Sequence, residues 1–204
     1  MRLTYAIALL SPHTARPEYQ ATDTGSSRLT AGDVIAAMGI VQARQPAGLA
    51  MVTAKFTKDS DAKKNALDAL TRYGCAVCCK YIGRTEGRNT FLAVRALAAF
   101  ALEDYSRTAD TPGAKCLCGG RGEIRDIKQS IKAGKPVTKT CARCKGSGLK
   151  PLPHSRCHHA IINYVRVSQS TYSRRWKPFY DALLSWCYQQ QSAAEREFEE
   201  ITRG

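Results

Sequence analysis

The chain has 204 residues, of which 44% are hydrophobic, and a formal net charge of +14. This length allows one medium domain or two small ones, and the apolar content argues against disorder of the whole chain. The apolar start of the chain is too short for a signal peptide, and no segment approaches the ~18 apolar residues of a membrane span. We therefore expect the nine cysteines to bind metal or to stay as thiols in a reducing cytosol.

The positive charge is concentrated in one third of the chain. Residues 115–181 contain fifteen Lys or Arg residues and three acidic residues. Clustered positive charge favours a polyanionic partner, because each neutralised phosphate releases condensed counterions. Gly, Pro and Cys interrupt this stretch, so it forms no basic amphipathic helix for a membrane surface. Nucleic acid is the favoured partner.

Residues 1–58 are expected to form a flexible leader with a short helix. Residues 11–31 are rich in Ser, Thr, Pro, Gly and Ala and have no apolar period, which indicates a flexible segment. Asp33 can cap a short helix that reaches Met38. The residues expected to stop this helix are Gly39, Pro46 and Gly48.

Residues 59–112 are predicted to form a helical hairpin of the body. Ser60 or Asp61 can cap the first helix, whose apolar residues recur at spacings of three and four and which ends at Gly83. The second helix begins near Asn89 and carries a broad apolar face. The first helix also contains cysteines that are interpreted as buried thiols, since no strand-to-helix context favours a redox motif; these are Cys75, Cys78 and Cys79.

Residues 113–152 carry paired cysteines and are predicted to form a small zinc-binding lobe. The second pair, Cys141 and Cys144, fits C-x-x-C-x-G-x-G, and Cys116 with Cys118 forms a shortened upstream copy. Four thiolates match tetrahedral Zn²⁺ in a closed structural site, whereas a catalytic zinc would keep one position open. The lobe has few apolar residues, so the metal would replace its core. Alternatives for the fourth ligand are Cys157, His158, His159 and His154.

Residues 153–204 are predicted to form a helix-turn-helix and a C-terminal helix that complete the body. A short helix over 155–165, a three-residue break and a helix capped by Ser168 have the required dimensions. Pro178 should kink the second helix or begin a new one. The alternative is a solvated basic face on a core helix. The candidate DNA-binding residues are Gln169, Ser170, Thr171, Ser173, Arg174, Arg175 and Lys177, with Arg143, Lys145 and Arg156.

The predicted fold class is therefore mostly α: a helical body with a helix-turn-helix and an inserted zinc-ribbon-like lobe. The chain resembles the antitermination protein Q family of lambda-type bacteriophages. The segments that carry the resemblance are 32–39, 109–116, 141–148, 171–174 and 177–183.

The resemblance implies a regulatory protein and not an enzyme. It implies binding to a specific double-stranded DNA site in the phage late promoter, beside RNA polymerase holoenzyme that pauses with its sigma factor. The protein would then join the polymerase and suppress pausing and termination, with NusA as a helper, in the host cytoplasm at the nucleoid. It also implies that one structural zinc ion is held by Cys116, Cys118, Cys141 and Cys144.

Two other protein classes share parts of this pattern. A DNA-binding regulator without antitermination activity would use the same zinc lobe and helices. A DnaJ-like chaperone module shares C-x-x-C-x-G-x-G, but it should show four knuckles and a J domain, and neither is present. Enzyme motifs are also missing, including an acidic cluster for Mg²⁺, H-E-x-x-H and a Walker loop.

Overall fold

The computed structural model describes residues 2–10, 30–83 and 87–203. The described residues are mostly helical, which confirms the predicted mostly α class. They fall into two compact units: a body formed by the chain up to Ser106 and from Cys157 onward, and a lobe formed by 107–156. Among the described residues, no helix is both long and apolar enough to cross a membrane.

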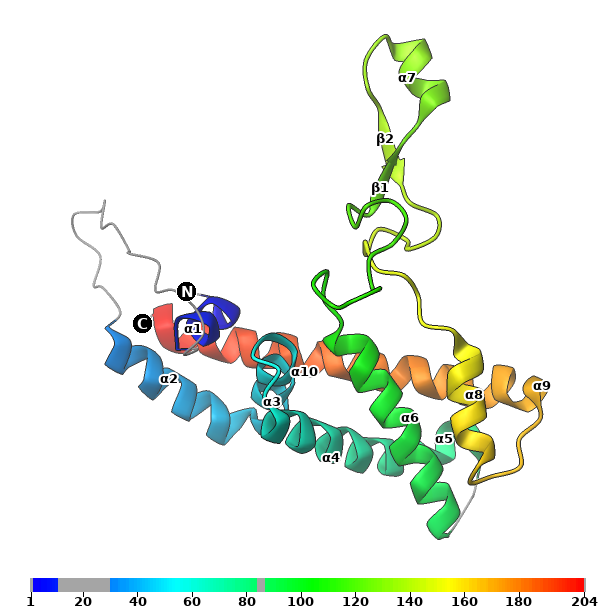
Figure 1. Ribbon diagram of the computed structural model, residues 1–204. Coiled ribbons are helices and arrows are strands. Elements are labelled where there is room, and N and C mark those ends of the chain that lie inside the picture. Colours follow the sequence, from blue (N-terminus) through cyan, green and yellow to red (C-terminus); the bar gives the residue numbers. More distant parts are fainter. Residues whose placement is uncertain (1, 11–29, 84–86, 204) are drawn as a thin grey trace. The chain divides into compact units, whose positions relative to one another are not determined.

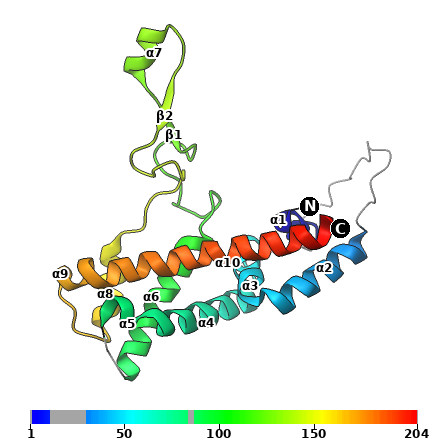
Figure 2. The same ribbon diagram turned by 180° about the vertical axis from the view of Figure 1, so that it is seen from behind.

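The body is organised around its last helix, α10 (Lys177–Arg203), which packs on α3 (Pro46–Phe56) and α6 (Arg88–Ser106). Helix α4 (Ser60–Val77) packs in turn on α3 and α6, so these four helices enclose the main core (Figures 1 and 2). The large, fully buried side chains of this core include Tyr105 of α6 and Phe179, Tyr180 and Leu183 of α10, which lie on the 3.6-residue apolar stripes of these two helices.

Two further helices build a second core at the other end of α10. Helix α1 (Leu3–Leu10) and helix α2 (Ala31–Arg44) pack with α3 around Ala194 and Phe198 of α10. The expected flexible segment 11–31 lies almost entirely outside the described residues. Where the structure describes residues 1–58, they are helical and contribute to a core.

Helix α2 runs through the residue that was expected to stop it. Its N-cap is Thr30, which forms a capping box with Asp33, so Asp33 is the third helical residue and not the cap. A Cβ at Gly39 would meet nothing within 4 Å, and an exposed glycine inside a helix costs only about 1 kcal/mol. A single glycine is therefore too weak a signal to end this helix.

Helix α3 begins at the proline that was expected to act as a breaker. Pro46 occupies the first helical position, where its missing N–H has no intrahelical partner to lose. Gly48 lies against the backbone carbonyl of Gln190 on α10, and a Cβ there would collide with it. The glycine thus allows two helices to approach closely, which sequence periodicity could not reveal.

Helices α4 and α6 lie where the sequence predicts the two helices of a hairpin, but the N-cap of α4 differs from the prediction. Asp59 is the N-cap of α4 and accepts a hydrogen bond from the N–H of Ala62 at 2.9 Å, so neither Ser60 nor Asp61 caps it. A four-residue helix, α5 (Cys79–Ile82), follows, and Gly83 ends it with φ of 83°. Glycine tolerates this left-handed region without steric cost.

The lobe contains a short antiparallel hairpin of β1 (Glu123–Arg125) and β2 (Thr138–Thr140), in which Ile124 pairs with Lys139. Helix α7 (Ile127–Ala133) connects the strands, capped by Asp126 and ended by Gly134 in the left-handed conformation. Within the lobe, α7 lies at the far end of the hairpin from the cysteine turns (Figure 1). Helix α7 was not predicted from the sequence, because seven residues are too few to show a helical period.

Candidate metal centre and nucleic-acid interface

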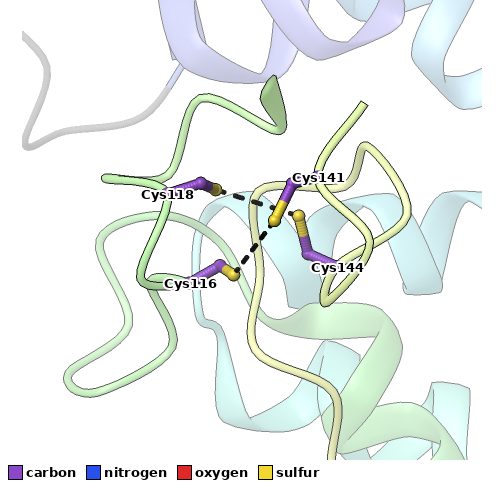
Figure 3. A group of neighbouring side chains, drawn as sticks. All are labelled: Cys116, Cys118, Cys141 and Cys144. Atoms are coloured by element: carbon purple, nitrogen blue, oxygen red, sulfur yellow. Dashed lines mark hydrogen bonds between the residues drawn. The ribbon is translucent and has the colours of Figure 1, made fainter. Parts of the chain in front are cut away.

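Four cysteine sulfurs converge in the lobe. The sulfur atoms of Cys116, Cys118, Cys141 and Cys144 all lie within 4.8 Å of one another, and Figure 3 shows them facing a common centre. The separation is 4.0 Å between the sulfurs of Cys116 and Cys141, and 3.9 Å between those of Cys118 and Cys144. Tetrahedral zinc with Zn–S bonds of about 2.3 Å needs sulfur separations of about 3.8 Å. The site can therefore hold one metal ion.

The two cysteine turns support each other through reciprocal backbone contacts. The N–H of Cys116 donates to the carbonyl of Gly148 at 2.9 Å, and the N–H of Cys141 donates to the carbonyl of Gly122 at 2.8 Å. Gly122 and Gly148 both have positive φ, and each lies against a carbonyl of the opposite turn where a Cβ would collide. The glycines are therefore required for the close approach of the turns as well as for their conformation.

The shortened first turn still brings its cysteines to the cluster. Gly119, Gly120 and Gly122 all have positive φ, so the chain reverses tightly after Cys118 and compensates for the missing residue. The alternative ligand Cys157 lies in the main core of the body, not in this cluster. Among the described residues, the metal-ligand group contains no histidine.

The backbone around Cys141 prepares this side chain for metal binding. The N–H groups of Cys144 and Arg143 donate to its sulfur and lower the pKa of the Cys141 thiol from 9.0 to about 7. Thiolate is the form of cysteine that binds metal. Backbone donors of this kind favour the charged form before a cation arrives.

The cysteines of the body do not form a comparable group. Cys78 is buried, and its thiol donates to the carbonyl of Cys75 at 3.2 Å, as expected for a structural thiol. Burial raises the pKa of both thiols. The expectation of a buried thiol is wrong for Cys79, which is exposed at the start of α5.

The segment predicted to be a helix-turn-helix contains two helices and a longer connection than expected. Helix α8 (His154–Ile162) is followed by six residues, 163–168, and then by α9 (Gln169–Thr171). Ser168 caps α9 by accepting from the N–H of Thr171 at 3.3 Å, which confirms the predicted cap. The five-residue π-helix η1 (Tyr172–Trp176) continues α9 into α10, with Pro178 in the first turn of α10. The helix-turn-helix itself stays a prediction.

His158 connects α8 to the start of α9, a role that sequence reasoning missed. Its Nε2 lies 2.9 Å from the carbonyl oxygen of Val167, and its ring packs on Tyr172 with centroids 5.2 Å apart. Tyr172 and Trp176 are buried. No local motif marks His158, because its partners lie on the other side of the turn.

The candidate DNA-binding residues of α9, η1 and α10 lie within residues 169–177. Thr171 and Lys177 are half-buried, and Lys177 forms an ion pair with Asp181 at 2.8 Å. Arg143 and Lys145 are exposed in the second cysteine turn, and Arg156 is exposed on α8. The exposed candidates within residues 169–177 are Gln169, Ser170, Ser173, Arg174 and Arg175.

The fold and the cysteine cluster define a helical protein with a lobe whose four cysteines could hold a metal ion. The family model for antitermination protein Q matches residues 110–195, which include the lobe and the segment from α8 into α10. The chain is 35% identical to antitermination protein Q of Salmonella phage P22 and 35% identical to that of Escherichia phage lambda. It is 34% identical to antitermination protein Q of Escherichia phage HK022. Each alignment covers 100% of both chains.

The chain belongs to the antitermination protein Q family, and its function is phage transcription antitermination. The family consists of regulatory factors. This result confirms the resemblance drawn from the segments around the cysteines and around Pro178.

Proposed function

We propose that the protein recognises a specific double-stranded DNA site in a phage late promoter through a helix-turn-helix of α8 and α9–η1. The observation that carries this proposal is the group of exposed amide, hydroxyl and guanidinium side chains at the N-terminal end of the second helix. Gln169 suits adenine, Arg174 and Arg175 suit guanine or phosphate, and the hydroxyls suit phosphate. Recognition helices use this end to contact base edges.

The lobe is proposed to fold around one structural zinc ion and to bind DNA phosphates. Sulfur separations of 3.9 and 4.0 Å support zinc at Cys116, Cys118, Cys141 and Cys144. Arg143 and Lys145 would contact phosphate from the second turn, and Arg156 from α8. In this proposal the phosphate contacts supply affinity that is independent of sequence, and α9–η1 supplies the choice of site.

The remaining steps of the proposal follow from family membership. The DNA-bound protein engages RNA polymerase holoenzyme that has paused with its sigma factor, and then travels with the enzyme past terminators. NusA assists, and the reaction takes place in the host cytoplasm at the nucleoid. Nothing in this scheme requires the protein to catalyse a reaction.

Single-round transcription tests this proposal. The template carries the late promoter that flanks this gene and a downstream intrinsic terminator, and it is transcribed by host polymerase with or without NusA. Wild-type protein should produce readthrough, whereas Cys144→Ala should not, because the lobe loses a metal ligand. The matched control is Cys79→Ala, an exposed cysteine outside the cluster, which should act like wild type.

Each arm has an outcome that contradicts the proposal. Full readthrough by Cys144→Ala would reject the role of the metal site. Equal readthrough on a template with a scrambled promoter region would reject site-specific DNA recognition. A zinc content unchanged between wild type and Cys144→Ala would reject the proposed ligand set.

A further inference from the structure

The segment proposed to read DNA enters α10 through an irregular turn. In η1 the N–H of Lys177 donates to the carbonyl of Tyr172, five residues back, whereas an α-helix uses the carbonyl four residues back. Turns of this π type are rare inside helices and occur frequently at functional sites. The function described so far does not explain why the turn lies here.

Pro178 provides a local cause for the irregular turn. Proline has no N–H to donate, and in a regular α-helix its ring would clash with the carbonyl four residues back, which here belongs to Arg174. Pro178 is the second residue of α10, two positions after Trp176 ends η1. One extra residue in the preceding turn moves the carbonyl of Arg174 away from the ring and relieves this clash.

The extra residue changes the direction of the first turn. Gln169, Trp176 and Leu183 are spaced by seven residues, and a continuous α-helix drifts by only about 20° over seven residues. Trp176 is 4% exposed and Leu183 is 0% exposed, so a continuous helix would direct Gln169 toward the same buried face. Gln169 is instead exposed. One inserted residue rotates the preceding turn by about 100°, which accounts for this difference.

Contacts on both sides of the π turn hold the rotated segment. Tyr172 and Trp176, the first and last residues of η1, are both buried in the main core. His158 packs on Tyr172, and its Nε2 lies 2.9 Å from the carbonyl of Val167, two residues before Gln169. The first turn therefore has a defined orientation and is not a frayed helix end.

We propose that Pro178 is a positioning residue for DNA recognition, which acts by keeping the π turn that directs Gln169 to solvent. This inference rests on the proposed recognition of DNA by α9–η1. It adds that the choice of DNA site depends on Pro178. Pro178 contacts no base in this scheme. Its effect passes through the turn to Gln169.

The test compares base discrimination among variants of the full-length, zinc-loaded protein. A site is first selected with wild type from random double-stranded DNA, and affinities are then measured for that site and for each single base-pair change. Gln169→Ala identifies the base pair at which Gln169 acts. Pro178→Ala should lose about 10- to 100-fold of discrimination at that same base pair, the range expected for one good side-chain contact to a base. Affinity for random DNA should stay unchanged, because no charge is altered.

A second variant distinguishes a changed direction of the Gln169 side chain from a general folding defect. Deleting Ser173 from Pro178→Ala leaves six residues from Gln169 to Trp176, so a regular α-helix again directs Gln169 about 100° away from the buried face. This variant should recover discrimination at the Gln169 base pair, which is scored separately from the overall affinity that is lost with the Ser173 hydroxyl. The matched control is Pro153→Ala, an exposed proline outside the helices, which should behave as wild type.

Different results overturn the inference and the proposed function. The inference fails if Gln169→Ala relaxes one base pair while Pro178→Ala discriminates as wild type does, or if deletion of Ser173 restores nothing. It also fails if Gln169→Ala relaxes no base pair. If wild type enriches no DNA site, the proposed DNA reading itself fails, and this inference fails with it.

Discussion

The contact between α3 and α10 makes a prediction about two glycines. A Cβ added to Gly48 would collide with the backbone carbonyl of Gln190 and would lie 2.7 Å from the Cβ of Ala194. Backbone atoms cannot rotate away as a flexible side chain can, so the two helices must separate. A Cβ added to Gly39, in the middle of α2, would meet nothing within 4 Å. The same substitution should therefore have opposite effects at the two sites.

The expected magnitudes follow from helix propensity and overpacking. Replacing a helical glycine by alanine stabilises by about 1 kcal/mol when the site is open, so Gly39→Ala should raise the free energy of unfolding. Gly48→Ala gains the same term but adds a collision in a packed core, which typically costs about 1–3 kcal/mol. The difference between the two variants isolates the collision and should be about 1–3 kcal/mol in favour of Gly39→Ala. For a protein of this size, that corresponds to roughly 2–12 °C in Tm.

Chemical denaturation followed by far-ultraviolet circular dichroism measures this difference, with excess zinc present so that the lobe stays constant. Comparison of the two variants with each other, and not only with wild type, removes the shared propensity term. A Gly48→Ala protein as stable as Gly39→Ala would refute the close approach of α3 and α10 at this residue.

Three further predictions concern the lobe and the body. Gly122→Ala should lower zinc affinity by about 10- to 100-fold, because the added Cβ meets a carbonyl of the opposite turn. A Cβ added at Gly134 would face open space, so Gly134→Ala should change zinc affinity less. Equal effects of the two variants in a zinc competition assay would argue against the reciprocal contacts between the turns. Lys145→Ala should weaken binding to all DNA sequences alike and reduce the salt slope by about 1, and a loss confined to one sequence would contradict a phosphate contact. Burial raises the pKa of Cys187 to about 12, so at pH 8 Cys79 should react with a thiol reagent while folded Cys187 does not. The Cys187 thiol ionises at lower pH in the unfolded chain than in the folded protein, so the free energy of unfolding of wild type should fall more steeply than that of Cys187→Ala as pH rises from about 9 to 12. Parallel profiles of unfolding free energy against pH would contradict this.

Much of the helical body could be predicted from the sequence, because its signals are local. The 3.6-residue apolar period that ends at Gly83 and the period of α6 both reflect which face a helix buries. The cap at Ser168 was equally readable, because a capping side chain bonds to a backbone group only three residues away. The cysteine cluster followed from spacing, since two turns of this type can present four thiolates to one ion.

The N-terminal region was harder to read because its signals depend on partners far away in the chain. Gly48 looks like a helix breaker in isolation, yet its small size is what lets α3 approach α10. Val34 and Val41 of α2 are buried in a cluster that includes Phe198, more than 150 residues later in the chain. Propensity is a weak term, and tertiary burial overrides it.

The sequence by itself determined the metal-ligand pattern, the basic character of residues 115–181 and the family, because each depends on residue identity and short spacing. Only the tertiary structure decided which carbonyls the knuckle glycines face, that His158 contacts the turn before α9, and that Gln169 is exposed. Helical periodicity alone would direct Gln169 toward Trp176 and Leu183. The π turn beside Pro178 changes that direction, since one inserted residue rotates a helix by about 100° relative to the core that holds it.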